Sequence, residues 1–333
     1  MRRATAIKLG SILAALVLAF TLPYVLPSYY VSLVTLVLTA ALLAMAVNLL
    51  AGQAGLVSMG HAGIAAAAGY GVAWSSRAGH SLATQLLLAL GLTLLTSVIY
   101  GLISMRTKGI YFLMVTLAAG MVCYGVAFRW SSVTGGDNGL TGIRRPAAVA
   151  EYWQYYFLVL LMFVLTLLAL MLVSRSPFGL VLRGVKDSDS RLRSLGYNIA
   201  AYKFTAIVLS GLVAGLAGVL TVWNTEFISP DSAGVVRSAL AVVMIVLGGL
   251  GTTLGPLVGA GIVVAIEHIL SSYVERWQLI LGLLFILAVI FAPSGLVGSL
   301  RRRRQRDRTP PVPDEEAAHP ADPHVLSSNH PER

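Results

Sequence analysis

The stretch VSLVTLVLTAALLAMAVNLL, Val31–Leu50, has no charged side chain and is followed at once by AGQAGLVSMGHAG, Ala51–Gly63. About 20 consecutive apolar residues are what an α-helix needs to cross a bilayer. The second stretch is rich in glycine and carries polar side chains, so it interrupts the apolar pattern before the next apolar run begins. Together the two stretches predict a membrane span that ends in a break.

The composition of the whole chain agrees with a membrane location. Of 333 residues, 57% are hydrophobic and 11% are charged, whereas soluble domains carry about 25% charged residues. The single cysteine, Cys123, excludes a disulfide framework or a thiolate metal cluster. The chain has no GxxxxGK[ST] phosphate-binding loop. We therefore expect a polytopic membrane protein that binds no nucleotide itself.

Apolar runs predict an all-α fold of about ten transmembrane helices. The long run Arg237–Val274 counts as two spans because GGLGTTLGP, Gly248–Pro256, interrupts it. The predicted spans are Leu9–Leu26, Val31–Leu50, Ala62–Trp74, Leu82–Ile103, Ile110–Phe128, Tyr155–Val173, Phe204–Trp223, Ser238–Leu247, Leu257–Ser272 and Gln278–Val297. We expect the first to be a retained helix and not a cleaved signal peptide.

The distribution of basic residues predicts the orientation. The net charge of +10 comes from 24 Lys and Arg against 14 Asp and Glu, and cytoplasmic loops collect such an excess. With both termini in the cytoplasm, seventeen basic residues fall on the cytoplasmic side and six on the other, leaving Arg333 in the tail. The pair Arg144–Arg145 is the local exception. This arrangement explains the positive charge without nucleic acid.

Two regions follow from this pattern. Residues 1–300 form the transmembrane domain, which includes one long hydrophilic loop at 174–203. Residues 301–333 begin with RRRRQRDR and continue with prolines, acids and histidines, a composition that cannot bury enough apolar surface to fold. We expect a disordered cytoplasmic tail, whose basic start either contacts anionic lipid headgroups or only anchors the last span.

The predicted spans contain few residues that could form a catalytic or metal site. An intramembrane enzyme needs paired acids, a Ser/His couple or a metal cluster, and neither HExxH nor GxSxG occurs. Glu267 and His268 are neighbours that point about 100° apart on one helix, so they do not form a catalytic dyad. We interpret them as polar residues near the external end of that helix. We expect no enzyme, no catalytic residue and no metal site.

The interrupted segment Asn48–Gly63 is a candidate for the substrate path. Discontinuous helices are tolerated at membrane depth only where they line a cavity or are covered by protein, and in transporters they commonly mark the substrate region. The alternative is that Gly and Ala only permit close helix packing. The candidate path residues are Asn48, Gln53, Ser58, His61 and Thr116.

Two loops are candidates for contact with partners. Apolar residues recur at helical spacing in Ser174–Lys203 with charges on the opposite side, which predicts short amphipathic helices that dock on a partner or rest on lipid. Gly196 is placed to end one of them. TGGDNGLTGI, Thr134–Ile143, is a turn-rich external loop, in which Gly135, Gly136 and Asp137 either receive a delivery protein or form an ordinary connection.

These motifs, in this order, resemble the permease subunits of branched-chain amino acid ABC importers, and in particular the longer of their two permeases. The resemblance covers Asn48–Gly298. The matching stretches are NLLAGQAGLVSMGHAGI, RTKGIYFLMVTLA, TGGDNGL, SPFGLVLRGVKDSDSRLRSLGYNIAAYK, SGLVAGLAGVL, FISPDS, VLGGLGTTLGPLVGA and FAPSGLVG.

The resemblance implies a bacterial inner-membrane importer with a second permease, two cytoplasmic ATPases that bind the ATP, and a periplasmic or lipid-anchored binding protein. No cofactor is implied on this chain. The substrate is a branched-chain or related small amino acid, with urea, short amides or aromatic acids as alternatives. A stand-alone ion-driven transporter would need ionisable residues in the spans, which are scarce.

The resemblance also places the ATPase-coupling segment at Ser176–Lys203. Ser188–Arg193 departs from the family, which commonly has a Glu- and Ala-rich run there. The candidate coupling residues are Arg183, Lys186, Asp187, Arg191, Leu195 and Gly196.

Overall fold

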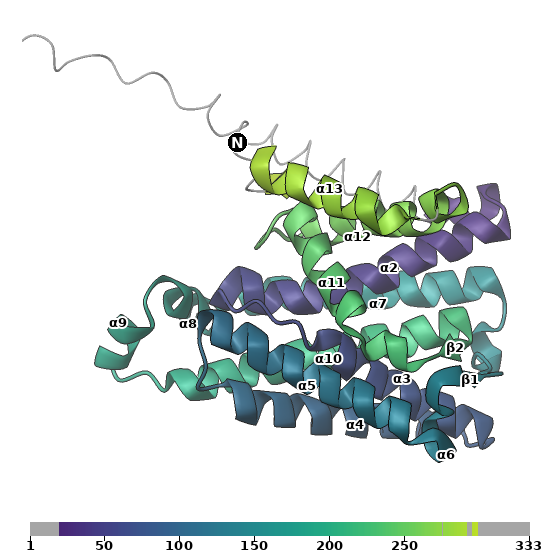
Figure 1. Ribbon diagram of the computed structural model, residues 1–333, viewed down its shortest axis with the longest axis horizontal. Coiled ribbons are helices and arrows are strands. Elements are labelled where there is room, and N and C mark those ends of the chain that lie inside the picture. The colour runs from purple at the N-terminus through teal and green to yellow at the C-terminus, as the bar shows by residue number, and fades with distance from the viewer. Residues whose placement is uncertain (1–19, 275, 292–294, 299–333) are drawn as a thin grey trace, which may run out of the picture. The chain divides into compact units, whose positions relative to one another are not determined.

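The computed structural model describes residues 20–274, 276–291 and 295–298, and its fold is all-α (Figure 1). The first predicted span therefore lies largely outside the described residues, and the tail 301–333 lies outside them entirely. The apolar helices are α2 (Ser28–Asn48), α3 (His61–Arg77), α4 (Leu82–Ser104), α5 (Gly109–Arg129), α7 (Tyr152–Arg175), α10 (Ile199–Thr225), α11 (Val235–Gly248), α12 (Gly255–Ile269) and α13 (Trp277–Phe291).

Each of these helices overlaps one predicted span. In the described part of the chain, six segments are long and apolar enough to cross a bilayer: α2 with its continuation to Ala54, α4, α5, α7, α10, and α12 with its continuation to Ser272. The other apolar helices, α3, α11 and α13, are shorter than 18 residues. The total of about ten spans and the cytoplasmic placement of both termini stay predictions.

Short elements connect the long helices. A π-helical turn η1 (Leu49–Ala54) extends α2, and α8 (Pro177–Asp187) and α9 (Asp189–Ser194) form the hydrophilic loop. A two-residue ladder pairs β1 (Leu140–Thr141) with β2 (Phe227–Ile228) in antiparallel register. The remaining short elements are α6 (Ser131–Thr134), η2 (Gly136–Asn138), η3 (Ala147–Val149), η4 (Pro230–Ala233) and η5 (Leu270–Ser272).

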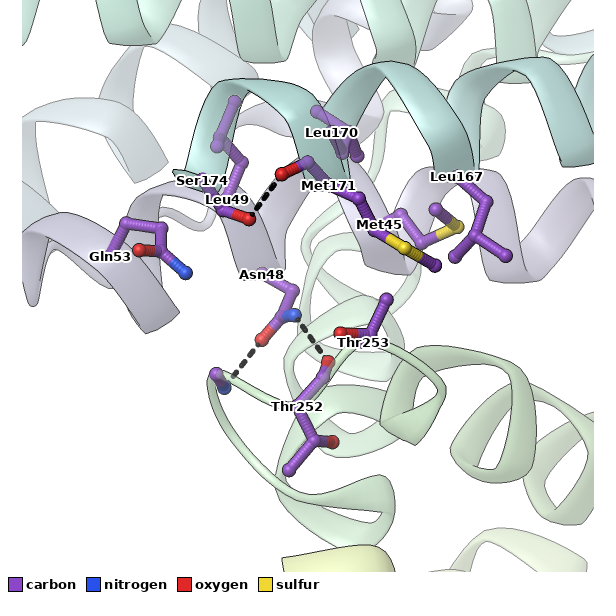
Figure 2. A pocket seen from close by; sticks show the side chains of 11 residues that line it. Met45, Asn48, Leu49, Gln53, Leu167, Leu170, Met171, Ser174, Thr252 and Thr253 are labelled. Atoms are coloured by element: carbon purple, nitrogen blue, oxygen red, sulfur yellow. Dashed lines mark hydrogen bonds between the residues drawn. The ribbon is translucent and has the colours of Figure 1, made fainter. Parts of the chain in front are cut away.

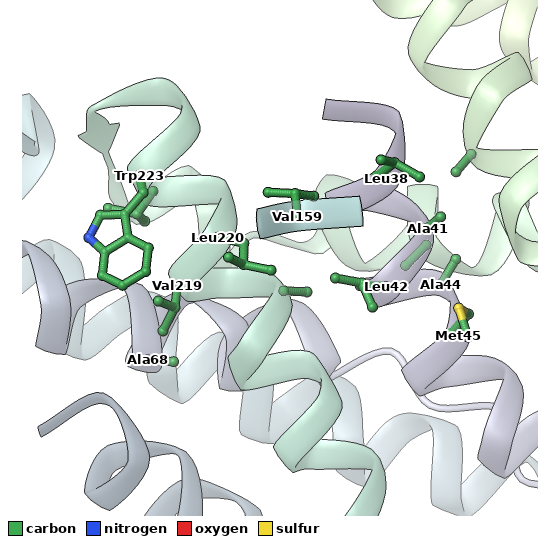
Figure 3. Packing of buried hydrophobic residues seen from close by; sticks show 14 of the residues in the cluster. Leu38, Ala41, Leu42, Ala44, Met45, Ala68, Val159, Val219, Leu220 and Trp223 are labelled. Carbon is green, nitrogen blue, oxygen red and sulfur yellow. The ribbon is translucent and has the colours of Figure 1, made fainter. Parts of the chain in front are cut away.

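Helix α10 runs through the middle of the bundle and packs against α2, α3 and α4. Its small residues permit this, because a Cβ on Gly218 would meet the Ala65 carbonyl oxygen of α3 at 1.9 Å and a Cβ on Gly215 would meet the Thr93 hydroxyl of α4 at 2.3 Å. Figure 3 shows part of the apolar cluster beside this approach, where Val219 of α10 lies near Ala68 of α3 and Leu220 lies toward Val159 of α7 and Leu42 of α2.

The connections gather at two opposite ends of the helices. In Figure 1, α8 and α9 lie at one end and α6, β1 and β2 at the other. Contacts join η1, the α4–α5 connection and the α11–α12 turn to the α8–α9 end. Which side of the membrane each end faces stays a prediction.

Arg145, the exception in the charge count, caps the C-terminal end of α10. Its guanidinium donates to the Trp223 carbonyl at 2.7 Å and to the Asn224 carbonyl at 3.0 Å, and lies 4.9 Å from the ring centroid of Tyr155. The last carbonyls of a helix have no partner within it, and a cation there is favoured by the helix dipole. The end of α10 thus holds Arg145 at the β1–β2 end, although the charge count places most basic residues on the other side.

The close approach of α3 and α10 gives a first prediction. Gly218→Ala should force the two helices apart and cost about 1–3 kcal/mol of stability. Gly91→Ala in α4 is the matched control, since a Cβ there meets nothing within 4 Å. Apparent melting temperatures of the detergent-purified protein should fall for the first variant and not for the second. Equal melting temperatures would contradict the packing argument.

Candidate functional site

The predicted interruption between α2 and α3 is present. Beyond Asn48 the chain makes the π-helical turn η1 and leaves the helix at Gly55, whose φ of 68° lies in the left-handed region that favours glycine. Residues 55–60 then run without regular structure to the start of α3 at His61. We call residues 48–60 the break.

The break re-enters the bundle and is covered by protein. The Met59 amide donates to the Thr116 hydroxyl of α5 at 3.2 Å. Gly60 lies so close to α4 and α5 that a Cβ would be 2.3 Å from the Tyr100 ring and 2.4 Å from the Thr116 carbonyl. A non-helical backbone needs such partners where water is excluded.

His61 fixes the start of α3 by bonds to two other segments. Its Nε2 lies 2.6 Å from the Ser210 hydroxyl of α10, and its Nδ1 lies 2.8 Å from the Ser58 hydroxyl. Since Ser210 donates its proton to the Ala46 carbonyl of α2, it accepts from Nε2–H, and Nδ1 accepts from Ser58. The ring is 2% exposed and both nitrogens are satisfied, so it holds α2, α3 and α10 together.

Asn48 and Gln53 occupy a different place from the other candidate path residues. They line a small cavity of about 50 Å³ between α2, α7 and the α11–α12 turn (Figure 2). The Asn48 amide clamps that turn, because it donates to the Thr252 carbonyl at 3.0 Å and accepts from the Gly251 amide at 2.9 Å. Ser58, His61 and Thr116 are instead buried in the bundle, where they form the hydrogen bonds described above. A path-lining role for the five stays a prediction.

The hydrophilic loop touches the break directly. Lys186 of α8 donates to the Gly52 carbonyl at 3.3 Å, and Arg183 donates to the Gln53 side-chain oxygen at 3.1 Å. Gly52 has no space for a side chain, because a Cβ would be 2.7 Å from the Gly251 Cα. We call the meeting of η1, α8 and the α11–α12 turn the junction.

Helix α8 is amphipathic, as predicted. Ser176 caps its start by accepting from the Gly179 amide, and Leu182 and Val185 are buried against the bundle. Gly196 ends the loop helices with a φ of 83°. The six candidate coupling residues are exposed, and the apolar side chain of Leu195 is 68% exposed. The loop can therefore reach a partner, and its ATPase contacts stay a prediction.

An ion cluster under α9 was not predicted. Asp189 pairs with Lys108 before α5, with Arg193 at 3.7 Å and with Lys203 of α10 at 3.8 Å. Burial would raise the pKa of Asp189, but the hydrogen bond from Lys108 and the charges of Lys203, Lys108 and Arg193 hold it below its ordinary value. Lys203 is 2% exposed. A lysine near the start of an apolar span is therefore the sequence signal that could have indicated a buried acidic partner.

The predicted external loop forms a compact turn. Gly135 and Gly136 have φ values of 76° and 58°, and a Cβ on Gly135 would meet the Gly139 carbonyl at 2.1 Å. These glycines therefore permit the turn, and Gly136 is buried. Asp137 is exposed beside them. Contact with a delivery protein stays a prediction, with Asp137 as the accessible side chain.

The His61 contacts give a second prediction. Ser210→Ala leaves the Nε2–H of His61 without its partner in a buried site, which should cost about 1–3 kcal/mol. Thr205→Ala is the control, because its hydroxyl is on the same helix, is exposed and bonds only to the Ala201 carbonyl. The apparent melting temperature should drop for Ser210→Ala alone. A drop of the same size in both variants would refute the role of His61.

Asp189 gives a pH-dependent prediction. A carboxyl whose pKa is depressed by folding contributes stability above its ordinary pKa of 3.8 and loses it as the pH falls through the depressed value. Asp189→Asn should therefore lower the melting temperature at neutral pH, and its difference from the wild type should shrink below about pH 3.8. Asp187→Asn, an exposed neighbour, is the control. A difference that does not change with pH would contradict the ion cluster.

Comparison with known proteins completes the description of the site. The family model described as "Branched-chain amino acid transport system / permease component" matches residues 29–290. The high-affinity branched-chain amino acid transport system permease proteins LivM of Salmonella typhimurium and of Escherichia coli are each 27% identical over 318 residues, covering 87% of this chain and 75% of theirs. The probable branched-chain amino acid transport permease protein LivH of Methanocaldococcus jannaschii is 24% identical over 58% of this chain and 66% of its own length.

No solved structure matches the chain. The family match spans η1, the break and the exposed α8–α9 loop, so it covers every element of the site described above. The apolar helices and these relatives together make the chain a multi-pass membrane protein. It belongs to the family of permease components of branched-chain amino acid ABC transport systems.

Proposed function

We propose that this chain is the translocating permease subunit of an importer in the bacterial inner membrane, for branched-chain or related small amino acids. The observation that carries the proposal is the junction, where Lys186 of the hydrophilic loop contacts Gly52 of the break and Arg183 contacts Gln53. A movement imposed on the loop from outside the membrane would be transmitted to the interrupted helix. Urea, short amides and aromatic acids are the alternative cargoes of the same class of importer.

The proposed partners follow from the exposed surfaces. Two cytoplasmic ATPases bind ATP and receive the α8–α9 loop, with the exposed Leu195 as the apolar anchor. The other proposed coupling residues, all exposed, are Arg183, Lys186, Asp187, Arg191 and Gly196. A second permease forms a heterodimer with this chain, a pairing supported by the similarity to both LivM and LivH proteins. An external binding protein docks on the side of Asp137.

The proposed mechanism is alternating access. ATP binding draws the ATPases together and displaces α8 and α9, and the junction transmits this displacement to η1. The break then changes its position relative to α3, α5 and α10, which opens the path to one side and closes it to the other. A ligand can shift two states only by binding them with different affinity, so the loaded binding protein must prefer one of them.

The function is tested with the assembled complex. The chain, its partner permease, the ATPases and the binding protein are produced together, and uptake of radiolabelled leucine is measured in proteoliposomes with ATP inside. Leu195→Asp should lower uptake about tenfold or more, the factor expected for a lost apolar anchor. Ser194→Asp adds the same charge at the exposed neighbouring position and should leave uptake near the wild-type rate.

Two results would count against the proposal. If the wild-type complex takes up no leucine, the substrate class is wrong, and uptake of urea, acetamide and benzoate distinguishes the alternatives. If the wild type works and Leu195→Asp still retains its ATPases and its uptake, the coupling surface lies elsewhere.

A further inference from the structure

A larger cavity, of about 260 Å³, lies within the helix bundle. Faces of α2, α10, α11 and α12, the first turns of α3 and the loop from Phe227 to Ser232 line it. That loop contains β2, so the cavity extends toward the β1–β2 end, opposite α8 and α9. The roles proposed above make no use of this cavity.

The walls are regular helix faces. Leu36, Thr39, Ala40 and Leu43 follow the i, i+3, i+4, i+7 pattern on α2, and the cavity-lining residues of α10 and α11 are spaced likewise. The hydroxyls of Thr39 and of Thr221 on α10 donate to carbonyls of their own helices. The walls are therefore mainly aliphatic, and their few hydroxyls keep acceptor capacity, which suits a branched hydrocarbon side chain.

Charges of both signs line the end of the cavity near the loop. Arg237, from the first turn of α11, pairs with Glu267 of α12 at 2.9 Å. Asp231 of η4 is exposed beside them, and no ion pair engages it among the described residues. This rim offers a guanidinium to a carboxylate and carboxylates to an ammonium group. Glu267, which the sequence explains only as a polar residue near a helix end, thus belongs to a mixed-charge rim.

The cavity is distinct from the one at the junction. On α2 its lining residues Leu36, Ala40 and Leu43 share one face, whereas Met45 and Leu49, which line the smaller cavity, lie on the opposite face. At its inner end the larger cavity reaches Ala65 and Ala66, one turn beyond His61. It therefore ends where His61 fixes α3, and a displacement of the break would act on that end.

We propose that this cavity binds the transported amino acid. The aliphatic side chain lies between α2, α10 and α11, the carboxylate is bound by Arg237, and the ammonium group is bound by Asp231 and Glu267. The proposal rests on the proposed function and names the substrate contacts within this chain. Movement of the break then releases the substrate past the first turn of α3.

Cysteine protection tests the site in the assembled complex. Thr221→Cys is made in a Cys123→Ala background and treated with a membrane-impermeant maleimide in reconstituted membranes. We expect labelling that leucine slows in a saturable manner by about tenfold or more, while isopentylamine and 4-methylpentanoate, which each lack one charge of the zwitterion, do not. Ser131→Cys, exposed outside the cavity, should be labelled without protection.

A transport measurement tests the rim. Arg237→Gln should raise the KM for leucine uptake about tenfold or more, as expected when a charge-assisted contact is lost. Arg129→Gln, an arginine at the same end but outside the cavity, should leave the KM unchanged.

The outcomes separate the two proposals. Absence of leucine uptake by the wild-type complex overturns the proposed function. Normal uptake together with unprotected Thr221→Cys labelling overturns this site alone. Labelling by a membrane-permeant maleimide but not by the impermeant one also overturns it, because the cavity would then open to lipid.

Discussion

A polypeptide that crosses hydrocarbon must satisfy its backbone polar groups within the protein, and the break between α2 and α3 is where this chain departs from continuous helix. Hydrogen bonds to several helices stabilise this break. Thr116 binds the Met59 amide, Asn48 binds the α11–α12 turn, and His61 joins α3 to α2 and α10. Helix α10 packs closely on both of its neighbours, since its glycines lie against α3 and α4.

The same supports tie the break to two different parts of the chain. One end of it is held in the bundle by His61, and the other end is held at the junction by Lys186 and Arg183. The ion cluster of Asp189 anchors α9 to α10 and to the start of α5. The loop is thus attached to the membrane helices at two places while its outer face stays exposed. In the proposed mechanism, this element moves as a unit and carries the interrupted helix with it.

Long-range polar pairs account for most of what sequence reasoning missed. Ser210 is 149 residues from His61, and nothing in the SGLVAGLAGVL stretch distinguishes its serine from a packing residue. Arg145 was an exception to the charge count because its partners, the last carbonyls of α10, are created by folding. Asp189 likewise meets Lys108 and Lys203 only when two connections and a helix converge. The mixed-charge rim of Arg237 and Glu267 arises in the same way.

The sequence by itself determined the apolar helices, the interruption after Asn48, the amphipathic loop and the family. These are local properties, since the hydrophobicity of about 20 residues and the backbone preferences of glycine act over one or two turns. Only the tertiary structure decided which polar residues meet, that Ser58 and His61 are buried in a hydrogen-bond network, and where the larger cavity lies. The physical reason is that a cavity or a polar pair belongs to several helices at once, and their contacting faces are set by packing.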